Sequence, residues 1–174
     1  MFAACQGLWS VEFSADASRE IDELVGRYPE RLGALIPVLF VAQREFGYLT
    51  REVFEVVAER LDVPTAQVLN TASFYTMLYK KPVGRHHVQI CRNVSCFLRG
   101  ADALTACLGS RLGLSNGDVS QDKQFSLELV ECLAACGGAP VVRINETYHE
   151  NVTLTAFESL LDGLAAGSEQ GVSG

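Results

Sequence analysis

Four cysteines in two widely separated pairs are the feature that most restricts how this chain can fold. Cys91 and Cys96 follow the apolar segment "VQI", and Cys132 and Cys136 follow the segment "LELVE". Four residues separate the first pair, three separate the second, and thirty-five lie between the pairs. If the two segments are neighbouring parallel strands, both pairs emerge at the carboxyl edge of the sheet, where open α/β sheets place their sites. We therefore expect one explanation for all four thiols.

The rest of the sequence indicates free thiols rather than disulfides. A chain of 174 residues, 48% of them hydrophobic, can bury enough apolar surface to fold without cross-links. The first 18 residues contain no basic residue and no long apolar run, so we expect neither a signal peptide nor a transit peptide. We also expect no membrane-spanning helix, because no segment reaches 18 uncharged apolar residues. In the reducing cytoplasm, cysteines are more often metal ligands, catalytic thiols or buried residues.

Charge excludes nucleic acid as an expected partner. The net charge is −7, and the sequence contains no block of lysines and arginines. Proteins that bind nucleic acid need such a basic surface to neutralise phosphates.

Apolar spacing predicts a helical front followed by a second domain. Apolar residues recur at intervals of three and four from residue 18 to about residue 80, which predicts a small helical bundle. We expect Ser18 and Thr50 to cap helices, Pro37 to bend or restart one, and Gly47 to end one. The composition changes at "KKPVGRHH", so we place a bundle at 1–82 and a second domain at 83–174.

The second domain is predicted to be α/β, which makes the whole chain α+β. Its predicted elements are a strand at 88–92, a helix from Ser95 to Leu112, a strand at 125–131, a hairpin turning near Asn145 and Glu146, and a last helix with Thr155 and Glu158 as a capping box. A strand, a crossover helix and a second strand of this length favour a parallel pair.

The spacing of the cysteines favours an iron–sulfur centre and leaves two alternatives open. Four cysteines are also a common structural zinc set, but zinc pairs are usually separated by two residues. A [2Fe–2S] cluster takes four cysteines, is larger than one ion and accepts wider spacing. Glycines in "ACGGAP" and at Gly100 would let backbone amides approach the sulfurs. Buried or redox-active thiols are the third interpretation, although the sequence has no C-x-x-C motif.

The remaining cysteines and the histidines are not expected at the site. Cys107 lies eleven residues past Cys96 on the same predicted helix, which corresponds to about 16 Å along the axis, so we expect a core residue. Cys5 is unexplained. His86, His87 and His149 have no cysteine or carboxylate at ligand spacing, so we expect them to be solvated or structural.

Several kinds of catalytic motif are missing from the sequence. It contains neither G-x-G-x-x-G nor G-x-x-x-x-G-K-[ST], so no dinucleotide or nucleotide site is expected. No nucleophile or paired-carboxylate constellation is visible either. If the chain takes part in chemistry, we expect it to carry electrons.

With these features in place, the sequence resembles a known family, the thioredoxin-like [2Fe–2S] E subunits of NADH-quinone oxidoreductase, respiratory complex I. The resemblance runs from about residue 35 to 153 and rests on "LIPVLFVAQREFGYL", "SFYTMLYKKPVGRHHVQICRNVSCFLRGA" and "ECLAACGGAPVVRINETYHENVT". It implies that Cys91, Cys96, Cys132 and Cys136 ligate the cluster and that residues 83–174 form a thioredoxin-like domain. Ala134 departs from the family pattern, which usually has glycine there.

The resemblance also implies partners and a location. The protein would sit against a flavoprotein subunit that holds NADH and FMN, among other subunits of the peripheral arm of complex I. It would exchange electrons with the flavin and lie at the cytoplasmic face of the bacterial inner membrane through the complex, without entering the membrane. The same resemblance admits an equivalent subunit of an NAD-linked hydrogenase or formate dehydrogenase. An alternative of another class is an interaction module stabilised by zinc.

Overall fold

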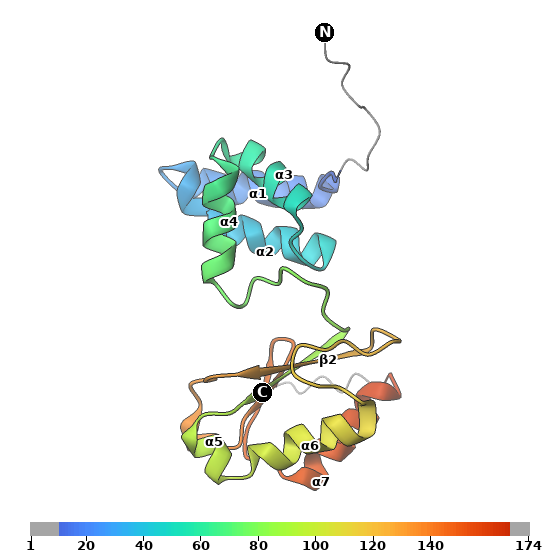
Figure 1. Ribbon diagram of the computed structural model, residues 1–174. Helices are drawn as coiled ribbons and strands as arrows, with labels where there is room; N and C mark the ends of the chain where they lie inside the picture. The colour runs from blue at the N-terminus through green and yellow to red at the C-terminus, as the bar shows by residue number, and fades with distance from the viewer. Residues whose placement is uncertain (1–10, 168–174) are drawn as a thin grey trace. The chain divides into compact units, whose positions relative to one another are not determined.

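The computed structural model describes residues 11–167, and the chain divides between Pro82 and Val83 into two compact units (Figure 1). Cys5 lies outside the described residues. Each unit has its own buried apolar core.

The first unit is helical, as predicted. Its elements are α1 (Ala15–Gly26), the 3₁₀ turn η1 (Arg31–Ala34), α2 (Leu35–Phe46), α3 (Arg51–Leu61) and α4 (Thr65–Phe74). Its fully buried side chains include Ile21, Val38, Leu39, Val53, Val57, Leu61 and Val68. These come from all four α-helices, so each contributes one apolar stripe to a shared core.

The helix ends confirm two of the sequence predictions and correct a third. The Thr50 side chain accepts a hydrogen bond from the Val53 amide, and Gly47 ends α2 with φ 80°. The cap of α1 is Ser14, whose Oγ accepts from the Ala17 amide at 3.2 Å. The prediction of Ser18 as that cap was wrong, because the helix already begins at Ala15.

Pro37 lies in the first turn of α2, directly after η1. The first backbone amides of a helix have no acceptor within the helix, so a proline there removes no bond. The predicted restart of the helix at this proline is therefore confirmed.

The second unit is built on a four-stranded mixed sheet, which confirms the α/β prediction. The strands are β1 (His86–Cys91), β2 (Phe125–Val130), β3 (Val142–Ile144) and β4 (Thr147–His149), in the order β2-β1-β3-β4. β1 pairs in parallel with β2, as predicted, and antiparallel with β3. The predicted hairpin joins β3 to β4, and Asn145 adopts φ 53° in its turn.

The helix predicted from Ser95 to Leu112 is two helices, α5 (Val94–Leu98) and α6 (Ala101–Leu112). Gly100 separates them with φ 95°, a left-handed conformation that glycine adopts without strain. The cap of α5 is Asn93, whose Oδ1 accepts from the Val94 amide. The estimate of 16 Å between Cys96 and Cys107 does not apply, because it assumed one continuous helix.

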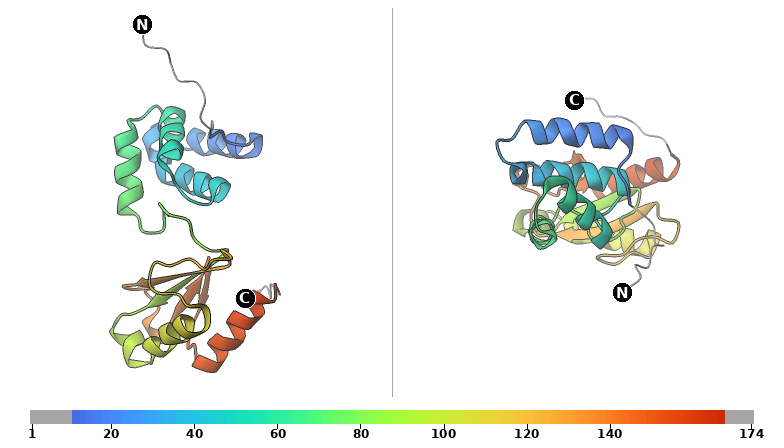
Figure 2. Two further views of the ribbon diagram at one scale, coloured as in Figure 1. Left: turned by 45° about the vertical axis from the view of Figure 1, so that its right-hand side comes forward. Right: turned by 90° about the horizontal axis from the view of Figure 1, so that it is seen from above.

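The last helix, α7 (Leu154–Ala165), begins earlier than predicted. Thr153 is its cap, and its Oγ1 accepts from the Ala156 amide at 3.2 Å, so the predicted capping box of Thr155 and Glu158 was wrong. α6 and α7 cover the same face of the sheet (Figure 2). Val88, Ile90 and Leu127 point into this core, together with Leu108 and Phe157 of the helices.

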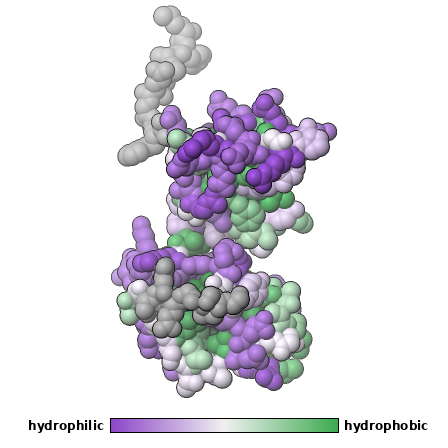
Figure 3. Space-filling model, turned by 180° about the vertical axis from the view of Figure 1, so that it is seen from behind, coloured by the Kyte–Doolittle hydropathy of each residue, from purple (hydrophilic) through white to green (hydrophobic). Residues whose placement is uncertain are grey.

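The outer surface of the first unit is mostly hydrophilic in the view of Figure 3. Exposed ion pairs join its helices, among them Arg44 with Glu20 and Arg60 with Asp22. Pairs of this kind contribute little stability because water screens them. Within residues 11–167, no helix is both long and apolar enough to cross a membrane.

Candidate metal centre

The parallel pairing of β1 and β2 places both cysteine pairs at one edge of the sheet. Cys91 is the last residue of β1 and lies opposite Val130, the last residue of β2. Cys132 follows two residues later. Both pairs therefore emerge at the carboxyl ends of neighbouring strands.

Direct contacts hold the two cysteine-bearing segments together. The Asn93 side-chain amide donates to the Glu131 carbonyl oxygen at 3.0 Å, and the guanidinium of Arg92 pairs with the Glu131 carboxylate. The Cys91 thiol lies 4.0 Å from the same carbonyl oxygen, and its amide donates to Val141 at 3.2 Å. Asn93 and Glu131 thus fix the separation of the two segments. Sequence reasoning missed both residues, although an asparagine just before a helix is a recognisable cap signal.

The first pair is buried. Cys91 is 3% exposed and Cys96 is 2% exposed, and both belong to the core of the second unit. Burial raises the pKa of the Cys96 thiol, and a hydrogen bond with Cys91 and the charges of Cys91 and Cys136 raise it further. The Val141 amide donates a hydrogen bond to the Cys96 sulfur, which lowers the pKa of this thiol. These contacts bring Cys96 together with one thiol of its own pair and one of the second.

The second pair is exposed and lies in a tight loop. Cys132 and Cys136 are both accessible to solvent. The Ala134 amide donates to the Sγ atom of Cys132 at 3.2 Å, and Ala134 adopts φ 59°. Cys136 begins the 3₁₀ turn η2 (Cys136–Gly138), and Gly138 is buried.

Position 138 requires glycine, because the Cys136 loop approaches the segment that contains Glu150 closely there. A Cβ atom at this position would lie 2.7 Å from the Glu150 Cβ and 1.9 Å from its Oε2. The Asn151 amide donates to the Gly138 carbonyl at 2.6 Å, which holds the segments at this separation.

The donor set fits a cluster of two irons. Cys91, Cys96, Cys132 and Cys136 are free thiols, and thiolates are the ligands that iron–sulfur clusters take. Two separate pairs match a cluster in which each iron takes two protein ligands. In the part of the chain that the structure describes, no group of three or more histidine, cysteine or acidic side chains surrounds a single ion position.

Cys107 and the histidines have other surroundings. Cys107 is buried in the core, which raises the pKa of its thiol. His87 is 6% exposed, with Nδ1 2.7 Å from Ser126 Oγ and Nε2 3.1 Å from Glu128 Oε2. His87 is therefore structural and not solvated. Burial lowers the pKa of His149.

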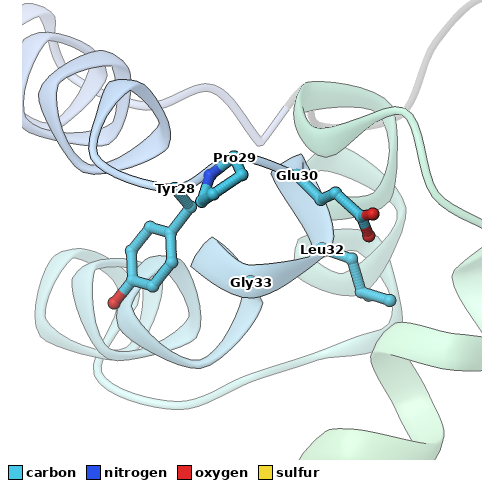
Figure 4. A pocket seen from close by; sticks show the side chains of 5 residues that line it. All are labelled: Tyr28, Pro29, Glu30, Leu32 and Gly33. Carbon is cyan, nitrogen blue, oxygen red and sulfur yellow. The ribbon is translucent and has the colours of Figure 1, made fainter.

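A shallow pocket in the first unit is formed by Tyr28, Pro29, Glu30, Leu32 and Gly33. Figure 4 shows the Tyr28 and Leu32 side chains on opposite sides of η1, so they do not converge. The lining of this pocket includes no cysteine or histidine, and none of the predicted site residues.

Comparisons with known proteins show the family of the chain. Residues 21–165 match the family model of the thioredoxin-like [2Fe-2S] ferredoxins. An E subunit of NADH-quinone oxidoreductase from Rhizobium meliloti is 42% identical over 147 residues, which cover 84% of this chain and 88% of the relative. The E subunit of the same enzyme from Rickettsia bellii is 38% identical over 146 residues, 82% of this chain and 87% of the relative.

A hydrogenase subunit and a hydrogenase structure are also similar. The NADP-reducing hydrogenase subunit HndA of Solidesulfovibrio fructosivorans is 37% identical over 143 residues, 82% of this chain and 84% of the relative. A crystal structure of an NAD⁺-reducing [NiFe]-hydrogenase in the H₂-reduced state superimposes with a TM-score of 0.65. The match has 19% identity and covers 74% of this chain and 22% of that chain, and it supports the fold alone.

Proposed function

The chain belongs to the family of thioredoxin-like [2Fe–2S] ferredoxins, and from that premise we propose that it is the electron-transferring E subunit of a bacterial NADH-quinone oxidoreductase. The observation that carries this proposal is the parallel pairing of β1 with β2, which brings two cysteine pairs to one edge. The identity to the E subunits of two bacteria, over more than four fifths of each chain, supports the choice of complex.

Cys91, Cys96, Cys132 and Cys136 are the proposed cluster ligands. When bound, a [2Fe–2S] cluster supplies a site that accepts and releases one electron. The thiolates of the chain hold it, and the Val141 and Ala134 amides point at two of the sulfurs and stabilise negative charge there. The buried pair shields one side from water, whereas the exposed pair faces solvent.

The proposed electron partner is a separate flavoprotein subunit that binds NADH and FMN. The sequence has no glycine-rich phosphate loop of its own. Next to the cysteines, α5 presents three apolar side chains to solvent: Val94 is 64% exposed, Phe97 55% and Leu98 75%. An exposed apolar patch of this kind is typical of a protein interface. Docking through α5 would bring the cluster edge near the flavin, and docking within the complex would hold the chain at the cytoplasmic face of the membrane.

A second candidate function is the equivalent subunit of an NAD(P)-linked hydrogenase. The observation in its favour is the 37% identity to the hydrogenase subunit HndA. The two functions require the same ligands and differ in the assembly that the chain joins.

Cluster content tests the ligand assignment. Protein purified without oxygen is expected to hold about two irons and two sulfides per chain, with an EPR signal after reduction by dithionite. Cys96→Ser and Cys136→Ser should lose or badly distort the cluster. Cys107→Ala is the matched control and should keep it, because Cys107 lies in the core of the unit outside the set of four. A colourless, zinc-containing protein without an EPR signal would favour the zinc-stabilised module.

Affinity for the flavoprotein tests the partner. The chain alone should not oxidise NADH, and affinity purification of the tagged chain from its source organism should recover flavoprotein and quinone-reducing activity. Leu98→Ser should weaken flavoprotein binding, whereas Leu154→Ser, at an apolar residue 43% exposed on α7, should not. Recovery of a hydrogenase would assign the second candidate. NADH oxidation by the chain alone would contradict the electron-carrier function.

A further inference from the structure

The loop between Cys132 and Cys136 contains a backbone donor aimed at a proposed ligand. The Ala134 amide lies 3.2 Å from Cys132 Sγ. Cys132 is exposed, so the bond does not arise from burial of the thiol in the core. It is formed within the loop itself, two residues along the chain.

The conformation of Ala134 lets the loop keep this bond and still return to the site. The orientation of the Ala134 amide is set by the preceding peptide, and the Ala134 φ sets the direction in which the chain continues. At φ 59° the chain turns back within two residues and places Cys136 close enough to influence Cys96. Residues with a Cβ atom rarely adopt this left-handed backbone conformation, because it brings the Cβ atom too close to the carbonyl oxygen. With a negative φ at position 134, the loop would lose either the hydrogen bond from the amide to the sulfur or the present position of Cys136.

The two pairs each receive one such donor. The Val141 amide donates to Cys96 in the buried pair, and the Ala134 amide donates to Cys132 in the exposed pair. Hydrogen bonds to the sulfurs are among the factors that set the reduction potential of an iron–sulfur cluster. Reduction adds one electron and hence one negative charge, so a donor to sulfur stabilises the reduced form more than the oxidised form.

We propose that Ala134 is a positioning residue that tunes the cluster: its amide, held by the left-handed turn, raises the reduction potential through Cys132. This inference rests on the proposed function, because it requires a [2Fe–2S] cluster on the four thiols. It predicts that the Ala134 amide hydrogen, and not the Ala134 side chain, sets part of the potential.

Replacement of the Ala134 amide by an ester tests this without changing the side chain. Lactic acid in place of Ala134 removes the N–H group and keeps the Cβ atom. The reduction potential of the full chain, measured by EPR-monitored titration, should become more negative at unchanged cluster content. An ester at Gly113, whose amide donates to the Gly109 carbonyl at 3.0 Å at the end of α6, is the control and should leave the potential unchanged. A wild-type potential in the Ala134 ester variant would overturn the inference.

A second measurement does not depend on the ester variant holding its cluster. Pulsed EPR of the reduced wild-type chain labelled with ¹⁵N-alanine should show a nitrogen coupled to the cluster, and Ala134→Gly should remove that coupling. Glycine adopts positive φ freely and keeps the N–H group, so this variant should retain the cluster at a potential close to wild type. Absence of the coupling in the wild-type chain would overturn the inference. A wild-type chain that binds no [2Fe–2S] cluster would instead contradict the proposed function.

Discussion

Of two adjacent glycines in the Cys136 loop, Gly138 should be sensitive to replacement by alanine and Gly137 should tolerate it. In Gly138→Ala the new Cβ would lie 2.7 Å from the Glu150 Cβ, a separation that real Cβ atoms do not show. The Glu150 carboxylate can rotate away, but its Cβ cannot move without the backbone. Ordinary contact requires the two segments to part by about 0.7 Å, against the 2.6 Å hydrogen bond from Asn151 to Gly138. In Gly137→Ala no atom lies within 4 Å of the added Cβ.

The expected magnitude follows from this difference. Overpacking of this kind lowers the free energy of unfolding by about 1–3 kcal/mol, and we expect about 2 kcal/mol for Gly138→Ala. That corresponds to roughly a 30-fold change in the ratio of folded to unfolded protein. Gly137→Ala should change stability by less than about 0.5 kcal/mol.

Hydrogen exchange of the β1 and β2 amides in the metal-free chain measures the effect, because those amides report on the second unit alone. Cluster retention after anaerobic reconstitution is the second readout, and only Gly138→Ala should lose iron faster than the wild type. Equal destabilisation of both variants would refute the reasoning, because it would mean that both glycines are needed for backbone freedom and not for the close approach to Glu150.

Two further substitutions test hydrogen bonds that stabilise the second unit. Ser126→Ala removes the Oγ atom that accepts a hydrogen bond from the Gly84 amide at 2.9 Å and lies 2.7 Å from His87 Nδ1. The substitution should lower the free energy of unfolding by about 2 kcal/mol in urea titrations. No change would mean that water replaces the hydroxyl. Thr153→Ala should cost about 1 kcal/mol through loss of the α7 cap, whereas Thr155→Ala should cost clearly less, and the reverse order would restore the capping box predicted from the sequence.

The arrangement of the sheet could be predicted from the sequence because it follows from regular patterns. Apolar runs of strand length on either side of a crossover helix predict a parallel pair, and Asn145 with Glu146 lies where two short strands must reverse. The edge that carries the cysteines follows directly from the parallel pairing. Thr50 and Gly47 were found because a cap and a left-handed glycine leave signals in the sequence.

Other features were not predictable because several residues could have served equally well. Ser14 and Ser18 are both good caps, as are Thr153 and Thr155, and tertiary packing decides between candidates a few residues apart. Gly100 could have been tolerated inside a helix, and the split into α5 and α6 depends on its φ in the folded chain. Alanine carries no signal for positive φ, so the conformation of Ala134 appears only in the structure.

The parallel pairing of β1 and β2 also determines when the site can exist during biosynthesis. Thirty-five residues separate Cys96 from Cys132, and the two pairs meet only after α6 has crossed the sheet and β2 has aligned with β1. A ribosome must therefore translate past Cys136 before a nascent chain can offer four thiols together. Long-range pairing of this kind forms late, because closing the intervening loop is entropically unfavourable. Binding of a cluster by all four thiols is thus coupled to the folding of the second unit, and the colour of the protein would report on that folding.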